Sequence, residues 1–158
     1  MSEYLEHDDE MLAWPNGDEV TTASIEAYAE DSRRVADTSL HAEAIRTPDW
    51  VIDELATVST HAAKMLVVIL NAETHKRRCA TRLNRAKAKS RWEHRDLPAA
   101  LIPARVVLDT VDEQDEYDLA VAAFEFARRV GNLLKDYTSR VQTIGKQVEI
   151  TYRHGSAS

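Results

Sequence analysis

From Asp49 to Leu97 the chain contains no Gly and no Pro, and apolar residues recur there at alternating spacings of three and four. This spacing is typical of a helix that packs lengthwise against another helix. A continuous helix over 49–95 would be roughly 69 Å long at 1.5 Å per residue, so we expect a partner helix alongside it. The alternative is a break near Ser59 or Lys76. The repeating positions are Val51, Leu55, Val58, Ala62, Met65, Ile69, Ala72, Cys79, Leu83 and Ala86.

A second long helix is predicted over 111–152. Leu97-Pro98 and Ile102-Pro103 end the first helix, because a proline disfavours helical geometry in the residue before it. Leu101 to Leu108 is then expected to be a short apolar linker, and Thr110 and Glu113 have the spacing of a capping box that starts the next helix. Gly131 and Gly145 lower helix propensity and are expected to permit close approach or a bend. The apolar positions are Tyr117, Ala120, Phe124, Ala127, Gly131, Leu134, Thr138, Val141, Gly145, Val148 and Tyr152.

The N-terminal region has a different composition. Residues 1–21 have few apolar groups at regular spacing and are predicted to form a flexible acidic tail. A shorter helix is predicted over 22–36, and Thr47 followed by Pro48 has the residues of an N-cap and first helical position. Residues 154–158 are expected to be a disordered C-terminus.

Together these elements predict an all-α protein. Its helical domain covers 22–153 and is a long antiparallel, coiled-coil-like helical hairpin with the shorter N-terminal helix packed on one end. Two helices cannot cover such broad apolar faces. We therefore expect a homo-oligomer, with a four-helix dimer as the simplest form.

Charge is distributed very unevenly along the chain. The formal net charge is −7. Residues 1–31 contain ten acidic residues and no Lys or Arg, whereas residues 76–95 contain nine Lys or Arg residues and one acid, Glu93.

The basic segment supplies the candidate binding residues. Arg78, Arg82, Arg85 and Lys89 follow a four-three-four spacing, which places them on one stripe of a helix; we call these four residues the basic stripe. A stripe of cations matches a nucleic-acid backbone, and Trp92 offers a surface for base stacking. Lys76, Arg91 and Arg95 are expected to extend it. The predicted contact residues for nucleic acid or a partner are Arg78, Arg82, Arg85, Lys89, Arg91 and Trp92.

The alternative interpretation of the basic stripe is structural. A helix face rich in Lys and Arg can simply be solvated, or it can pair with the protein's own acids in 1–31 and 109–118. The sequence leaves both interpretations open.

No pattern of catalytic or metal-binding residues is present in the sequence. The six histidines form no recognised metal motif, and the lone Cys79 falls at an apolar helix position, where a thiol is more often core than nucleophile. The acids near 109–118 suit the positive end of a helix dipole. The four glycines are isolated, which excludes a Gly-rich phosphate loop. We predict a protein that is not an enzyme and has no catalytic residue, metal or cofactor.

We expect a cytoplasmic protein that does not contact a membrane. The sequence shows no apolar run of about 18 residues, and its acidic start lacks the basic residues of a secretory signal.

The segment from Glu116 to Tyr152, preceded by a basic helix and a Pro-containing linker, resembles small helical-hairpin proteins encoded by bacteriophages. The resemblance covers about residues 60–153 and rests on pattern. It implies an accessory role in DNA replication or recombination, in the host cytoplasm, and transfers no catalytic residue. The acidic N-terminal extension is not part of that pattern.

Two functions are therefore expected. The first is a non-enzymatic module that contacts single-stranded nucleic acid, or a protein that handles it, through the basic stripe, with the acidic tail as an internal brake. The alternative is a structural or assembly protein whose hairpin docks on an acidic or other protein partner and has no nucleic-acid role. Small secreted helical hairpins of actinobacteria represent that second class, but their Trp-x-Gly turn is absent, since Trp92-Glu93-His94 has no glycine.

Overall fold

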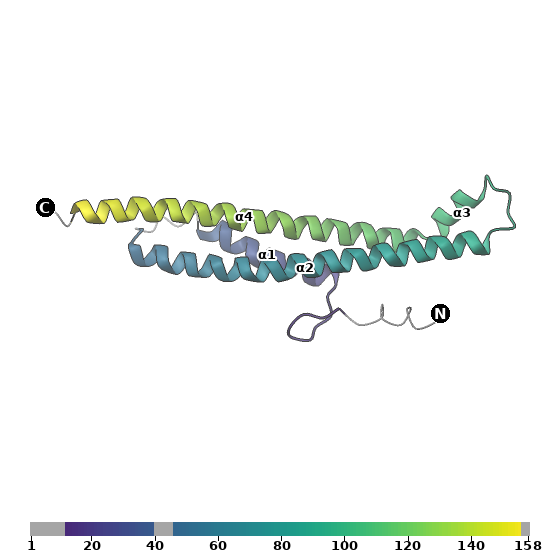
Figure 1. Cartoon of the computed structure of the whole chain (residues 1–158), viewed down its shortest axis with the longest axis horizontal. Helices are drawn as coiled ribbons and strands as arrows, with labels where there is room; N and C mark the ends of the chain where they lie inside the picture. Colours follow the sequence, from purple (N-terminus) through teal and green to yellow (C-terminus); the bar gives the residue numbers. More distant parts are fainter. Residues whose placement is uncertain (1–11, 40–45, 156–158) are drawn as a thin grey trace. The chain divides into compact units, whose positions relative to one another are not determined.

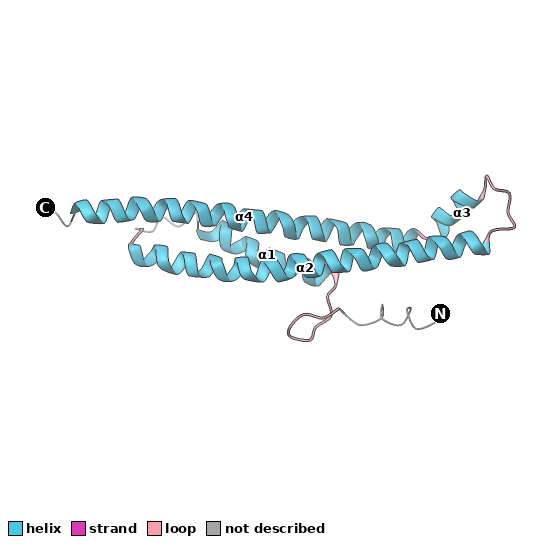
Figure 2. Cartoon of the chain, viewed as in Figure 1, coloured by secondary structure: helices cyan, strands magenta, loops and turns pink. Residues whose placement is uncertain are grey.

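The computed structural model describes residues 12–39 and 46–155, and this part of the chain is all-α. It contains helices α1 (Thr22–Ser39), α2 (Pro48–Glu93), α3 (Ile102–Asp109) and α4 (Val111–Gly155), shown in Figure 1. Within the described ranges, β structure is limited to an isolated bridge between Ala13 and Glu19, and Figure 2 shows helices joined by loops.

The start of α2 has the predicted cap. The Thr47 side-chain oxygen accepts a hydrogen bond from the Trp50 backbone N–H at 3.2 Å, and Pro48 is the first helical residue. The helix is continuous to Glu93, without a break at Ser59 or Lys76. Helix α4 reaches Gly155, so the expected disordered C-terminus is wrong for 154 and 155; residues 156–158 lie outside the described part.

The chain divides into two compact units. Unit 1 comprises Met1–Ile25 and Leu70–Glu125, and unit 2 comprises Glu26–Ile69 and Phe126–Ser158. Each unit therefore contains one part of α2 and one part of α4.

Unit 2 has a core built from three helical segments. Tyr137 on α4 donates a hydrogen bond to the Glu54 carboxylate on α2 at 2.7 Å. Ser32 Oγ on α1 lies 3.2 Å from Nδ1 of His61 on α2. The buried residues recur at sevens on both long helices, as expected for lengthwise helix packing. They are Ala29, Ser32, Ala36, Val51, Val58, Met65, Val68, Ala127, Val130, Leu134, Tyr137, Val141 and Val148.

At the two glycines of α4, the helix approaches α2 closely. The sequence predicts either close approach or a bend at these positions. A Cβ atom on Gly131 would lie 3.0 Å from Cδ1 of Ile69, and one on Gly145 would lie 2.9 Å from Cγ1 of Val51. Any larger residue would therefore press directly on α2 within unit 2.

Unit 1 buries more polar groups. His75 occupies the core position where the apolar repeat of α2 is interrupted, and its Nε2 lies 3.2 Å from Thr22 Oγ1 and 3.8 Å from Cys79 Sγ. Lys76 lies beside the core, with its ammonium 3.7 Å from the centre of the Phe124 ring. The buried residues are Trp14, Val20, Ile25, Ala72, His75, Cys79, Leu83, Ser90, Val106, Thr110, Ala120, Ala123 and Phe124.

The expectation of a flexible tail over 1–21 is wrong for residues 12–21. Trp14 is only 5% exposed, and its indole N–H donates to Ser24 Oγ at 3.0 Å. Gly17 has a φ of +90°, which lets the chain turn so that the Trp14 N–H donates to the Asp18 carbonyl at 2.8 Å. Two buried apolar side chains, Trp14 and Val20, are enough to fix this loop in unit 1. Residues 1–11 lie outside the described part.

The segment expected to be an apolar linker contains helix α3. Pro103 in its first turn costs no hydrogen bond, because the first N–H groups of a helix have no intrahelical acceptor. The predicted capping box is also wrong: Thr110 ends α3, and its hydroxyl donates back to the Val106 carbonyl at 2.9 Å.

Helix α2 contains an 18-residue window with a mean hydropathy of 1.4, long and apolar enough by composition to cross a membrane. This window is defined by its mean hydropathy and tolerates up to two charged residues, so it differs from the unbroken apolar run of about 18 residues that was not expected. Core helices of soluble proteins pass the same test, but only 22% of this window is buried.

Candidate nucleic-acid or partner interface

The basic stripe lies on the part of α2 that belongs to unit 1. Successive residues of an α-helix are about 100° apart, so Arg78, Arg82, Arg85 and Lys89 fall within an arc of about 60° on this continuous helix. Trp92 falls at the edge of the same arc, and its side chain is 69% exposed. The Arg95 guanidinium lies 4.2 Å from the Trp92 ring centre, within the range of a cation–π contact.

Arg91 does not extend the basic stripe. It comes nine residues after Arg82, which is two and a half helical turns, and therefore lies on the opposite side of α2. Lys76 also lies away from the stripe, over Phe124. Arg95 follows the last residue of α2. The positive charge of the segment is thus divided between two flanks of the helix.

Part of this charge is paired within unit 1. Arg82 forms a 3.0 Å ion pair with Glu116 on α4, and Lys89 lies 3.8 Å from Glu93 on its own helix. On the other flank, Lys87 donates to the Gln114 side chain at 3.0 Å. The paired cations stay accessible, since the side chains of Arg82 and Lys89 are 53% and 77% exposed.

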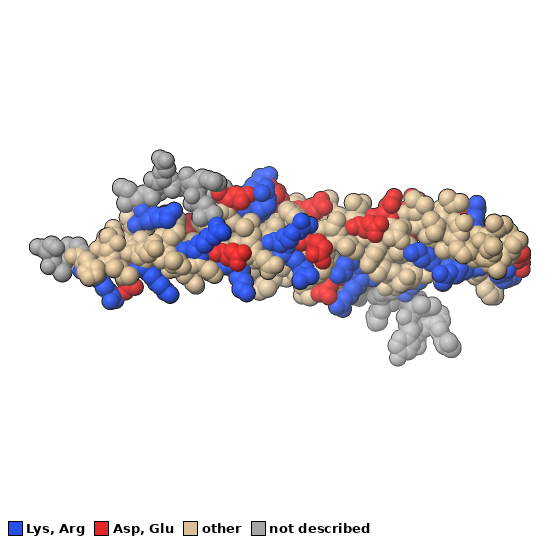
Figure 3. Space-filling model, turned by 90° about the horizontal axis from the view of Figure 1, so that it is seen from above, with Lys and Arg blue, Asp and Glu red and all other residues tan. Residues whose placement is uncertain are grey.

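Figure 3 shows the distribution of charge on one face of the molecule. Lys and Arg side chains gather along the lower edge near the right-hand end of this view, which is the end that carries α3 in Figure 1. Elsewhere on this face, basic and acidic side chains are interspersed. On this face, positive charge is therefore concentrated in unit 1.

A polar cluster that the sequence did not indicate joins the end of α2 to α3. The Asp109 carboxylate accepts a 2.8 Å hydrogen bond from Ser90 Oγ, lies 2.7 Å from His94 Nε2 and forms a 3.2 Å ion pair with Arg105. The Ser90 bond, followed by His94 and Arg105, lowers the pKa of Asp109 below its ordinary value. Ser90 and His94 are 19 and 15 positions from Asp109 along the chain, so spacing alone gave no signal of the cluster.

Exposed apolar side chains lie close to this cluster along the chain. Helix α3 buries only Val106, while Val107 and Leu108 are exposed, as are Leu97 and Leu101 in the preceding loop. Unit 1 thus presents exposed apolar groups near exposed cations.

The remaining reactive groups are held in the core. Cys79 is buried, and burial raises the pKa of its thiol, which disfavours the reactive thiolate. Burial, followed by the charge of Arg82, lowers the pKa of His75. Over the described ranges, no three His, Cys, Asp or Glu residues lie close enough together to hold a metal ion.

No protein family, curated protein or solved structure was found to match this sequence.

Proposed function

We propose that this chain is a non-enzymatic binding protein that contacts single-stranded nucleic acid through the basic stripe of unit 1. The observation that carries this proposal is the common face of four cations with the exposed Trp92 ring at its end. Cations on such a face neutralise successive phosphates, and the aromatic ring stacks on a base. The accessory role of the phage proteins that this chain resembles, in the cytoplasm of a host cell, is consistent with this activity.

We further propose that α2 and α4 pair as an antiparallel, coiled-coil-like hairpin. Supporting contacts occur within each unit. In unit 1, Lys76 meets Phe124 and Lys87 meets Gln114, so the α4 number falls as the α2 number rises. In unit 2, Val51 lies nearest Gly145 and Ile69 lies nearest Gly131, with the same direction.

The acidic N-terminal region acts in this proposal as a brake on binding. Glu19, Glu116, Arg78 and Arg82 all influence the charge state of His75 electrostatically, which puts acids and cations of the basic stripe around one point of unit 1. Further acids in residues 3–10 would compete with phosphates for the same cations.

The first test measures fluorescence anisotropy of labelled single-stranded oligonucleotides over a salt series. The variant R85E/K89E spares Arg82, whose ion pair with Glu116 also stabilises the fold. We expect at least tenfold weaker binding and a shallower dependence on salt, by about 0.7 in logarithmic slope for each lost phosphate contact. The matched control R140E/K146E makes the same charge change at exposed positions of α4 in unit 2. Equal affinity for the two variants would refute the proposal.

Deleting residues 1–11 tests the brake and leaves the Trp14 loop intact. We expect tighter binding and a steeper salt dependence, because fewer acids compete with phosphate. Weaker binding after this deletion would mean that the acidic segment makes contacts with the ligand.

The second candidate function is a structural or assembly protein that docks on a protein partner. The exposed Val107 and Leu108 of α3 favour it, because exposed apolar side chains grouped together mark interaction surfaces. This function predicts no salt-sensitive oligonucleotide binding, and it predicts that V107E/L108E abolishes assembly with the partner while R85E/K89E does not.

A further inference from the structure

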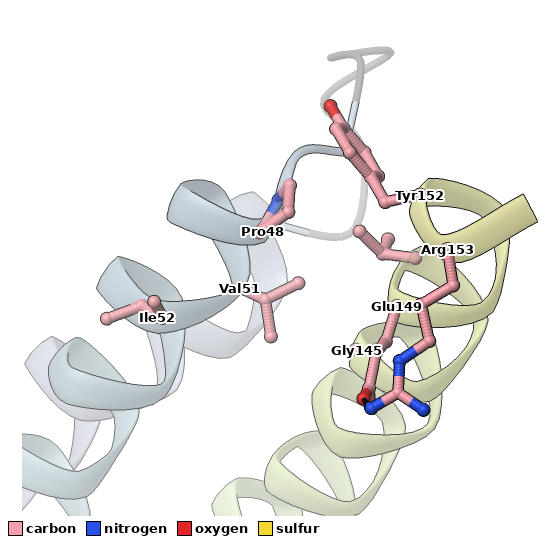
Figure 4. Close-up of a pocket in the computed structure, with 8 residues that line it drawn as sticks. Pro48, Val51, Ile52, Gly145, Glu149, Tyr152 and Arg153 are labelled. Carbon is pink, nitrogen blue, oxygen red and sulfur yellow. Dashed lines mark ion pairs between the residues drawn. The ribbon is translucent and has the colours of Figure 1, made fainter. Parts of the chain in front are cut away.

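Unit 2 has a groove between α2 and α4. Two hollows, of about 570 and 710 Å³, lie between these helices. Their α2 residues, such as Ile52 and Leu66, are fourteen positions apart, as are their α4 residues Gly145 and Gly131. Fourteen residues are close to four helical turns, so both hollows lie on one side of the two helices. Figure 4 shows the first of these hollows, with Val51 on the side of α2 that faces α4 and Tyr152 projecting from α4 at its end.

Along the edge of this groove α2 carries an exposed, mostly apolar ridge, which we define as Ile52, Ala56, Ser59, Ala63 and Leu66. Of these, Ile52, Ala63 and Leu66 also line the hollows. All five residues are exposed, with Ile52 at 65% and Leu66 at 71%. Their four-three-four-three spacing is the repeat by which one helix packs along another. The ridge is about 21 Å long, from Ile52 to Leu66, at 1.5 Å per residue.

The ridge faces away from α1. Three residues on the internal face of α2 each follow a ridge residue by two positions. Glu54 follows Ile52, His61 follows Ser59 and Val68 follows Leu66. Two residues correspond to about 160° of separation around the helix when measured the short way. His61 contacts Ser32 of α1, and Glu54 contacts Tyr137 of α4. The internal face is therefore occupied, and the apolar repeat on the outer face is left exposed.

We propose that this groove binds a second copy of the chain, with the two exposed ridges packed antiparallel across a twofold axis. A ridge with helix-packing spacing calls for a helix that carries the same repeat, and a twofold interface uses one surface twice. In an antiparallel register, Ala56 faces Leu66 of the second copy, and Ser59 faces its Ala63. Small residues then meet large ones, and the centre of the interface allows close approach.

Charge at the two ends of the groove determines the antiparallel direction. Asp49 and Asp53 lie beside the ridge at its start, where Glu149 and Arg153 of α4 pair with each other at 2.5 Å. Arg128 and Lys135 line the other hollow. Antiparallel copies bring the acidic end of one groove to the basic end of the other, whereas parallel copies bring like charges together.

An anionic membrane surface fits this groove less well. Its α4 wall carries Asn132, Lys135 and Gln142, whose polar groups would be taken out of water. The two aspartates at the start of the ridge would also be repelled by anionic headgroups.

The experiment measures the mass of the full chain in solution by light scattering over a concentration series. We expect a dimer of about 36 kDa, twice the chain mass of 17.8 kDa. The variant L66E places a charge on the ridge and should raise the dissociation constant at least 100-fold. Its matched control is L119E, an exposed leucine of α4 in unit 1. Because both positions are exposed, we expect helicity by circular dichroism to be unchanged.

Cysteine cross-linking tests the direction of pairing. Mixed S59C and A63C chains should form a disulfide-linked dimer on oxidation, whereas I52C alone should not, because the two Ile52 positions lie far apart in this register. The native Cys79 is buried and can remain.

A monomeric full chain overturns the proposal, whether or not it floats with anionic lipid vesicles. A dimer that L66E leaves intact and L119E dissociates overturns it as well, since the interface would then lie elsewhere. Cross-linking of I52C alone would overturn the antiparallel direction. These outcomes are independent of oligonucleotide binding, so failure of this inference and failure of the proposed function are distinguishable.

Discussion

Helix α2 carries different chemistry on its outer positions in the two units, although its inner positions follow one repeat. In unit 2 α2 carries the exposed ridge of Ile, Ala, Ser and Leu, and apart from Ser32 the described buried residues are hydrophobic. In unit 1 α2 carries the basic stripe, and the core includes His75, Ser90 and Thr110. The exposed positions of α2 in unit 1 also include Thr81, Asn84 and Ala88. The inner repeat therefore specifies that these segments pack as helices, while the exposed positions give the two units different surfaces.

Because the described buried residues of unit 2 are hydrophobic apart from Ser32, its stability should depend mainly on apolar packing. We expect Leu134→Ala to lower the free energy of unfolding by about 2–5 kcal/mol, because the side chain is fully buried and leaves a cavity. The neighbouring Leu133→Ala should cost less than about 1 kcal/mol, since that side chain is at the surface. Urea denaturation followed by circular dichroism compares the two, and equal losses would contradict the described burial of α4.

Substitutions at the two glycines of α4 test how closely α2 and α4 pack in unit 2. An alanine at position 145 gains about 1 kcal/mol of helix propensity but presses on the stiff Val51 side chain, with a cost of about 1–3 kcal/mol. We therefore expect Gly145→Ala to lower the free energy of unfolding by about 1 kcal/mol. At position 131 the contact is the flexible end of Ile69, so Gly131→Ala should be neutral or stabilising. Thermal or urea unfolding measures both, and a loss at 131 larger than at 145 would refute this reasoning.

A substitution in the N-terminal loop of unit 1 should have a smaller effect on stability. Trp14→Phe keeps most of the buried apolar surface but removes the indole N–H that donates to Ser24, a loss of about 0.5–1.5 kcal/mol. Trp92→Phe is the matched control at an exposed position and should leave stability unchanged. If Trp14→Phe also had no effect, residues 12–21 would not be anchored as described.

The smallest expected effect is a pH dependence specific to unit 1. Burial, followed by Arg82, lowers the pKa of His75 in the folded protein. The unfolded chain then binds a proton more readily, so the stabilisation is complete above the ordinary histidine value of about 6.5 and declines as pH falls below it. Thermal melts between pH 8 and 5 should show this decline, and His75→Gln should flatten it while the exposed His154→Gln does not. A decline that His75→Gln leaves unchanged would exclude His75 as its cause.

The apolar repeat and the prolines allowed the helices to be predicted, because a three-four spacing sustained over many turns rarely arises outside a helix. Helix α3 was missed because eight residues with an internal proline give no clear period. The Trp14 loop was missed because it is held by two buried side chains, Trp14 and Val20, and not by a repeat. The basic stripe followed from spacing, whereas the Asp109 cluster depends on contacts between distant residues. The exposed ridge of α2 was overlooked because the inner repeat already accounted for most apolar residues.

The anchored Trp14 loop sets the reach of the acidic residues that precede it. Glu3 is nine residues from Leu12, so it can extend at most about 32 Å from that point. A competitor tethered at such a distance acts at an effective concentration that does not change when the protein is diluted. Any inhibition of nucleic-acid binding by these acids would therefore be independent of protein concentration. A ligand with closely spaced phosphates could overcome it, but diluting the protein could not.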